Sequence, residues 1–112
     1  MTRWTLVAAC LAIMMAETGP HFTGFVTLIE RTGGNGQARV TVESHANKIV
    51  RRHLLTVTSR TVIVKREGQT EKAVHLDSLA AKDWVKVWFA GEEKSSYPVE
   101  VTARRIMIVD RP

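Results

Sequence analysis

The stretch from residue 83 to residue 91, DWVKVWFAG, constrains the fold of this chain more than any other segment. Val85, Val87 and Phe89 alternate along this segment with a second set of residues. The second set is Trp84, Lys86 and Trp88. This period of two is typical of a β-strand with one face in a core. A turn region and a second strand-like run at residues 99–109 follow, which together predict a small β-barrel or sandwich.

The size and composition of the chain limit the classes of protein to which it can belong. A chain of 112 residues with 45% apolar and 24% charged residues is typical of one globular domain. Lys and Arg number 16 against 11 Asp and Glu, which gives a net charge of +5. This surplus permits an anionic partner, such as nucleic acid or an anionic envelope polymer, without requiring one. The basic residues are scattered, so no basic tail is indicated.

The amino terminus has the pattern of a secretory signal. Arg3 precedes an uninterrupted apolar run at residues 6–16, which is shorter than the about 20 residues that span a bilayer. We therefore predict a signal-like segment at 1–16, a single domain at 17–112, and export to the periplasm, cell surface or medium. Lipidation of Cys10, after Val-Ala-Ala, is a lesser alternative. The other alternative is a first helix that packs on the domain.

The rest of the chain predicts five strands, at residues 22–30, 38–43, 60–66, 84–90 and 99–109, the last bent near Arg104. Gly24 indicates a bend or bulge, and residues 32–36 indicate a hairpin turn. Residues 44–52 are expected to form a loop or a short helical turn, and residues 53–57 can extend or begin a strand. Residues 70–81 predict one or two turns of helix. This arrangement is an all-β, five-stranded Greek-key barrel on the OB plan.

Several of these segments carry a resemblance to a known family. The segments are FTGFV at 22–26, VESH at 42–45, TVI at 61–63, DWVKVWFAG at 83–91, SYP at 96–98 and residues 103–108. Together they resemble the YobA-like group of small exported bacterial barrels. Lys82 and Glu100 depart from that pattern. The resemblance implies an OB-type fold and export, and it supplies no catalytic residue.

The predicted strand 84–90 also holds the clearest candidate for a ligand surface. Trp84, Lys86 and Trp88 share one face, and exposed aromatic residues beside a cation can stack rings of a ligand. The alternative is that both faces of this strand are covered, one of them by the helical connection or the amino-terminal segment. Further candidates are Arg51 and Arg52 in the segment 44–52, and Tyr97 in the segment 91–97.

The sequence offers no set of residues for catalysis or metal binding. The four histidines have no ligand spacing, so we predict no metal and no cofactor. Glu92 and Glu93 follow a Gly in a turn and are interpreted as surface charges. A hydrolase is a minor hypothesis, which requires a Ser or Glu beside a His in one cleft.

The leading hypothesis is an exported, non-enzymatic binding or envelope-accessory module. Its partner is unknown; an anionic envelope component or a protein is preferred to nucleic acid, and membrane contact is expected only through the amino-terminal segment. The alternative is an intracellular OB-type protein that binds single-stranded nucleic acid, which requires residues 1–16 to be part of the fold.

Overall fold

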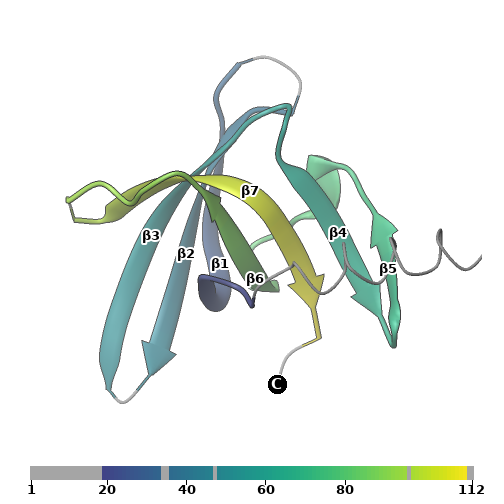
Figure 1. The fold of residues 1–112 in the computed structure, drawn as a ribbon, viewed down its shortest axis with the longest axis horizontal. Helices are drawn as coiled ribbons and strands as arrows, with labels where there is room; N and C mark the ends of the chain where they lie inside the picture. The colour runs from purple at the N-terminus through teal and green to yellow at the C-terminus, as the bar shows by residue number, and fades with distance from the viewer. Residues whose placement is uncertain (1–18, 34–35, 47, 96, 111–112) are drawn as a thin grey trace, which may run out of the picture.

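The computed structural model describes residues 19–33, 36–46, 48–95 and 97–110. The predicted segment 1–16, with Cys10, lies outside these residues. The described chain is all-β (Figure 1). Its elements are β1 (Phe22–Arg31), β2 (Ala38–Ala46), β3 (Ile49–Val57), β4 (Val62–Glu67), β5 (Thr70–Ala73), the 3-10 turn η1 (Leu76–Ser78), β6 (Trp84–Ala90) and β7 (Val99–Val109). No described helix is long and apolar enough to cross a bilayer.

Five of the strands close into a barrel in the order β1-β2-β3-β7-β6, which returns to β1. All contacts around the barrel are antiparallel except one. The exception is the closing pair, in which β3 runs parallel to β7 from His53 opposite Val99 to Thr56 opposite Thr102. Closure gives β3 and β7 a partner where an open sheet would expose their edges. The predicted OB-like barrel of five strands is thus confirmed.

The third barrel strand differs from the prediction. It is β3, formed by residues that were expected to be a loop followed by a possible strand. The charged pair at Arg51 and Arg52 obscures its pattern, although His53, Leu55 and Val57 alternate inward and are buried. The expected third strand is β4 instead. It pairs with β5 and with the second half of β7, and so lies outside the closed barrel (Figure 1).

The connection between β4 and β6 is also less helical than predicted. Residues 70–73 form β5, with Thr70 opposite Glu67 across a tight turn. Only η1 is helical, and it is one 3-10 turn. Its position has a packing reason, because Leu76 and the following Leu79 are both buried in the main core. Burial of each such side chain contributes about 1.5–3 kcal/mol to stability.

The barrel interior is filled by every second side chain of its strands. Val40 and Val42 of β2, and Val85 and Val87 of β6, are fully buried, as the alternation predicts. Phe89 is buried as well. The side chains on the other face of β6 therefore point away from the core, and this geometry positions the candidate site.

A β-bulge bends β7 where the sequence predicted a bend. Trp88 lies opposite Arg105 and Phe89 lies opposite Ala103, so Arg104 is the extra residue. Before the bulge β7 pairs in parallel with β3, and after the bulge it pairs in parallel with β4. A bulge of this kind increases local twist, which lets one strand serve both the barrel and the β4–β5 hairpin.

Candidate ligand-binding face

The outer face of β6 carries the three residues singled out by the sequence, but they do not share one environment. Trp84 and Lys86 are half-buried, whereas Trp88 is only 4% exposed and packs with Val64 and Met107. The guanidinium carbon of Arg105 lies 5.0 Å from the centre of the Trp88 ring. Trp88 is therefore unavailable to a ligand, and the face retains Trp84 and Lys86.

Arg105 also connects the barrel to the β4–β5 hairpin. Its guanidinium donates to the carboxylate of Glu71 on β5. The positive charge of Arg105 therefore already interacts with an aromatic ring and with a carboxylate of the protein itself. We therefore assign Arg105 to the architecture of this face, and not to ligand recognition.

Two aromatic side chains that no sequence pattern singles out extend this face toward β2. The ring of Phe25 on β1 lies 5.5 Å from that of Trp84 and 5.3 Å from that of His45. Phe25 is opposite Trp84 in the β1–β6 pairing. Only the register brings these rings together, because the residues are far apart in the sequence. The sequence indicates this contact only by an aromatic residue at position 25 within a strand-like segment.

Trp84 lines two pockets of about 350 and 340 Å³, and these lie on opposite faces of the sheet because Arg66 of the first and Lys65 of the second are consecutive residues of β4. We call the first pocket the Trp84 groove. Trp84, Val109 and Asp110 line both. The first pocket also includes Thr23, Arg66 and Lys86. The second also includes Lys65, Lys82 and Asp83. Each volume is near the lower end of the about 300–1,000 Å³ that is usual for small-molecule sites.

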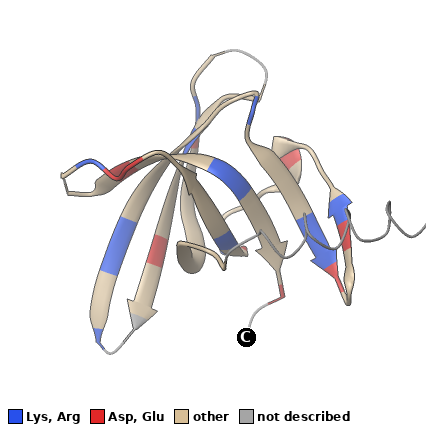
Figure 2. Cartoon of the chain, viewed as in Figure 1, with Lys and Arg blue, Asp and Glu red and all other residues tan. Residues whose placement is uncertain are grey.

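The charges around the Trp84 groove are mixed, with the cations Arg66 and Lys86 and the carboxylate of Asp110. Figure 2 shows basic residues on β6 and along the β4–β5 hairpin beside it. In the second pocket, Asp83 Oδ2 accepts a hydrogen bond from the backbone N–H of Ala80 at 2.9 Å. Asp110 is exposed and has no hydrogen-bond or ion-pair partner within the described part of the chain. The groove thus combines a cationic surplus with one accessible acceptor.

The remaining predicted site residues lie elsewhere. Arg52 lies 3.4 Å from Glu43, measured from its guanidinium nitrogen to Oε2, and so belongs to an ion pair on the outer side of β2 and β3. Arg51 is exposed on β3, and Tyr97 is 71% exposed in the β6–β7 connection. That connection follows the end of β6 opposite Trp84. The structure therefore does not bring Arg51 and Tyr97 to the Trp84 groove.

A buried histidine closes the barrel end near that connection. His53 packs its ring 4.1 Å from the Phe22 ring and 5.6 Å from the Phe89 ring. Its Nε2 lies 3.7 Å from Glu93 Oε2, and its buried Nδ1 has no hydrogen-bond partner among the described residues. Burial lowers the pKa of His53, Glu93 opposes that shift, and the charge of Arg51 adds to it. His53 is thus held toward its neutral form.

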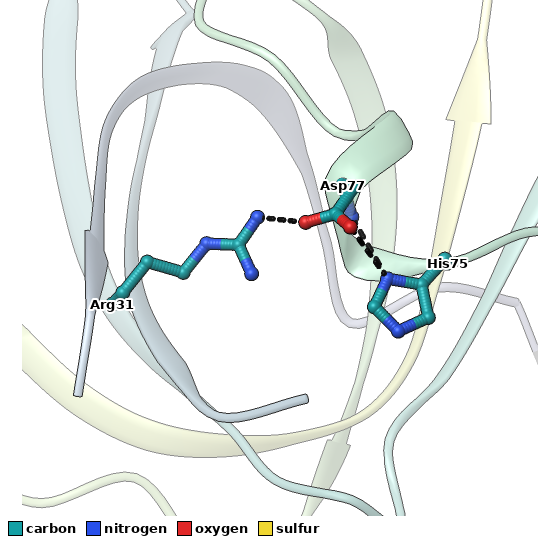
Figure 3. Close-up of polar contacts among 3 residues, drawn as sticks. All are labelled: Arg31, His75 and Asp77. Carbon is teal, nitrogen blue, oxygen red and sulfur yellow. Dashed lines mark hydrogen bonds and ion pairs between the residues drawn. The ribbon is translucent and has the colours of Figure 1, made fainter. Parts of the chain in front are cut away.

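A second histidine belongs to an exposed polar cluster at the 3-10 turn (Figure 3). Arg31, at the end of β1, donates to Asp77 Oδ1. His75 Nδ1 lies 3.3 Å from the backbone nitrogen of Asp77 and 3.2 Å from its Oδ2. The hydrogen bond and charge of Arg31 lower the pKa of Asp77. All three side chains are more than half exposed, so the cluster ties η1 to β1 at the surface.

Neither histidine completes a nucleophile–base pair in the part of the chain that the structure describes. No hydrogen bond there joins a serine hydroxyl to a histidine ring, and no three potential metal ligands cluster. Comparison with known proteins adds no further assignment. No family model matches the sequence, and no curated protein or solved structure shows significant similarity to it.

Proposed function

We propose that this chain is an exported, non-enzymatic binding or envelope-accessory module that takes its ligand in the Trp84 groove. One observation carries the proposal. A half-buried tryptophan, Trp84, lines a pocket of about 350 Å³ that also includes Lys86 and Arg66. A concave site with an aromatic wall and a few charged groups is the usual form of a ligand site. Export is supported by Arg3 and the apolar run at residues 6–16.

The rigid framework around the groove supports binding at this place. Trp84 and Lys86 project from β6, a barrel strand that is paired with a neighbouring strand on each side. The Trp84 ring also packs against the ring of Phe25. Because these side chains start from a paired strand, little backbone entropy is lost when a ligand binds. The exposed connection between β6 and β7, which carries Tyr97, does not offer this preorganisation.

The proposal is tested by NMR on the full chain. A panel of soluble acidic oligosaccharides, neutral oligosaccharides and oligonucleotides is titrated while the indole N–H signal of Trp84, assigned with W84F, is followed. We expect at least one ligand to shift the Trp84 signal to saturation and leave Trp88 nearly unmoved. K86A should weaken that ligand about tenfold, as expected for a lost hydrogen bond to a charged group.

K94A is the matched control for K86A, because it removes the same charge from the connection at the other end of β6. It should bind with unchanged affinity. Failure of the whole panel to move Trp84, or equal losses in K86A and K94A, would contradict the proposed site.

Binding of single-stranded nucleic acid remains the second candidate. The observation in its favour is the row of aromatic rings from Trp84 through Phe25 to His45 on an OB-type barrel. The carboxylates of Glu43 and Asp110 flank the same row and oppose a polyphosphate chain. The oligonucleotides of the panel test this candidate directly.

A further inference from the structure

We propose that the free edge of β3 at Ile49–Arg52 binds an extended acidic segment of another protein as an added antiparallel strand. β2 pairs with β3 along its whole length, whereas β7 pairs with it only from His53 to Thr56. Within the described part of the chain, Ile49–Arg52 therefore has no strand partner on the side away from β2. Figure 1 shows this end of the β2–β3 hairpin reaching past the barrel, away from the β6–β7 connection. It is a second binding surface, separate from the Trp84 groove and beyond the function proposed above.

The backbone groups of Val50 point to this free edge. In β2 the carbonyl oxygen of Glu43 points to β1, where it lies beside Gly24. Because backbone groups alternate in direction along a strand, those of the next residue, Ser44, point to β3 and its partner Arg51. Val50 precedes Arg51, so its N–H and its carbonyl both point away from β2. An incoming strand can exchange two hydrogen bonds with Val50 without displacing any bond of the barrel.

The side chains along the free edge combine apolar surface with positive charge. Ile49 and Val50 are 57% and 44% exposed, although both are branched aliphatic residues. Three cations flank them: Lys48, Arg51 and Arg52. Among the described residues, the carboxylate that forms an ion pair with this group is Glu43, 3.4 Å from Arg52. Figure 2 shows basic residues on this half of β3. The edge thus attracts a strand that carries carboxylates beside apolar side chains.

The positions of these side chains predict the order of residues in the partner segment. His53 points into the barrel, so alternation places Arg51 and Ile49 on its face of β3 and Arg52 and Val50 on the other. Each face has one basic and one aliphatic side chain, and the basic one is nearer to β7. Side chains directly opposite each other in paired strands interact, and antiparallel pairs are slightly more stable than parallel ones. The partner strand should therefore have, from its amino end, two acidic and then two apolar residues.

Neither the edge of β5 nor a second copy of the chain fits as well. The β5 edge, Thr70–Ala73, carries charges of both signs and no large apolar side chain, which is typical of an edge that avoids pairing. Two copies could pair their β3 edges about a two-fold axis, with Val50 opposite Val50. That arrangement would bring Lys48, Arg51 and Arg52 of both copies together, and like charges across strands are destabilising.

The test uses the isotopically labelled full chain and blocked peptides. The first peptide has Glu-Glu-Val-Val at its centre, and a control peptide of the same composition has Glu-Val-Glu-Val. We expect the first to bind saturably below about 1 mM and to slow hydrogen exchange of the Val50 amide at least about tenfold, because that N–H becomes bonded. The reordered peptide should bind several-fold more weakly.

N-methylated peptides test the backbone contact. In an antiparallel pair, the peptide residue opposite Val50 directs its own N–H to β3, and the residue before it directs its N–H away. N-methylation of the residue opposite Val50 should weaken binding at least about tenfold, since a hydrogen bond is lost and a methyl group enters the interface. N-methylation of the preceding residue should be tolerated.

Substitutions test the charge complementarity. R51E should weaken the acidic peptide about fivefold or more, because an attraction becomes a repulsion. R60E is the matched control, since it makes the same charge change in the connection at the other end of β3, and it should leave the affinity unchanged. K86A should also leave it unchanged, so this result and that for the Trp84 groove remain separate.

Several outcomes would overturn the inference: no binding at about 1 mM peptide, equal affinities of the two peptide orders, equal losses in R51E and R60E, or binding without protection of Val50. Protection of Val50 that rises with protein concentration in the absence of peptide would overturn it as well, because it would identify a second copy of the chain as the partner.

Discussion

Gly24 of β1 lies so close to Glu43 of β2 that a Cβ atom on Gly24 would sit 2.2 Å from the Glu43 carbonyl oxygen. No real side chain tolerates this separation. The absence of a side chain at residue 24 lets β1 approach β2 beside Phe25, which in turn contacts Trp84. The extra residue of the nearby bulge is Thr27, so Gly24 serves close approach rather than the bulge itself.

Substitution of this glycine should therefore be costly. We expect G24A to lower the free energy of unfolding by about 1–3 kcal/mol, because the backbone of β2 must move. G19A is the control, since a Cβ there meets nothing within 4 Å, and it should change stability by less than about 0.5 kcal/mol. Urea denaturation measures both. Equal stabilities for the two variants would contradict the close approach.

The two neighbouring leucines of β3 test which face lines the barrel. Leu55 is fully buried in the core, whereas Leu54 is half-buried on the outer side. L55A should cost about 2–5 kcal/mol through lost burial and a cavity, and L54A should cost clearly less. Denaturation of both variants provides the measurement. A larger loss for L54A would mean that the register of β3 is shifted by one residue.

The hydroxyl group of Thr61 holds the connection between β3 and β4. It donates to the carbonyl oxygen of Ala103 at 2.7 Å and accepts from the backbone N–H of Thr58 at 3.0 Å. T61V keeps the shape of the side chain but removes both bonds, so it should lower stability by about 1–3 kcal/mol. T61S retains the hydroxyl and should recover most of this loss. A thermal unfolding series in which T61V matches the wild type would refute this role.

Stability should depend on pH through His53. Its pKa in the folded protein lies below the ordinary value of 6.5, so the unfolded chain binds the proton more readily. The free energy of unfolding should therefore fall as pH decreases from above 6.5 to the lowered pKa, and the contribution should then level off. Denaturation curves across this range measure the effect.

The neighbours of His53 should move its pKa in opposite directions. E93Q removes the group that raises the pKa and should lower it further, whereas R51M removes a cation and should raise it. NMR titration of the His53 ring distinguishes them. A shift of the same sign in both variants would exclude the electrostatic account.

The part of the fold that follows from local alternation could be predicted. The strands at 84–90 and 99–109, the buried Val40 and Val42, and the bend near Arg104 all appear where the sequence indicates them. The third barrel strand could not be identified in this way. Arg51 and Arg52 look like loop residues, yet they continue a strand because β2 pairs with it along its whole length.

The candidate site shows the same division between local and long-range information. Sequence pattern places Trp84, Lys86 and Trp88 on one face, and that face is correct. It does not reveal that Arg105 and Met107 of β7 enclose Trp88, or that Val109 and Asp110 continue the pocket beside Trp84. These contacts depend on the register between strands, which is set by closure of the barrel.

The sequence by itself determined that this chain is a small barrel with a mixed aromatic and basic strand, because side-chain alternation along a strand is a local property. The tertiary structure alone decided which of the two tryptophans of β6 remains accessible and which charges surround it. Those outcomes depend on pairings between residues far apart in the chain, such as Phe25 with Trp84 and Trp88 with Arg105. No local pattern records such pairings, since they arise only when distant strands align.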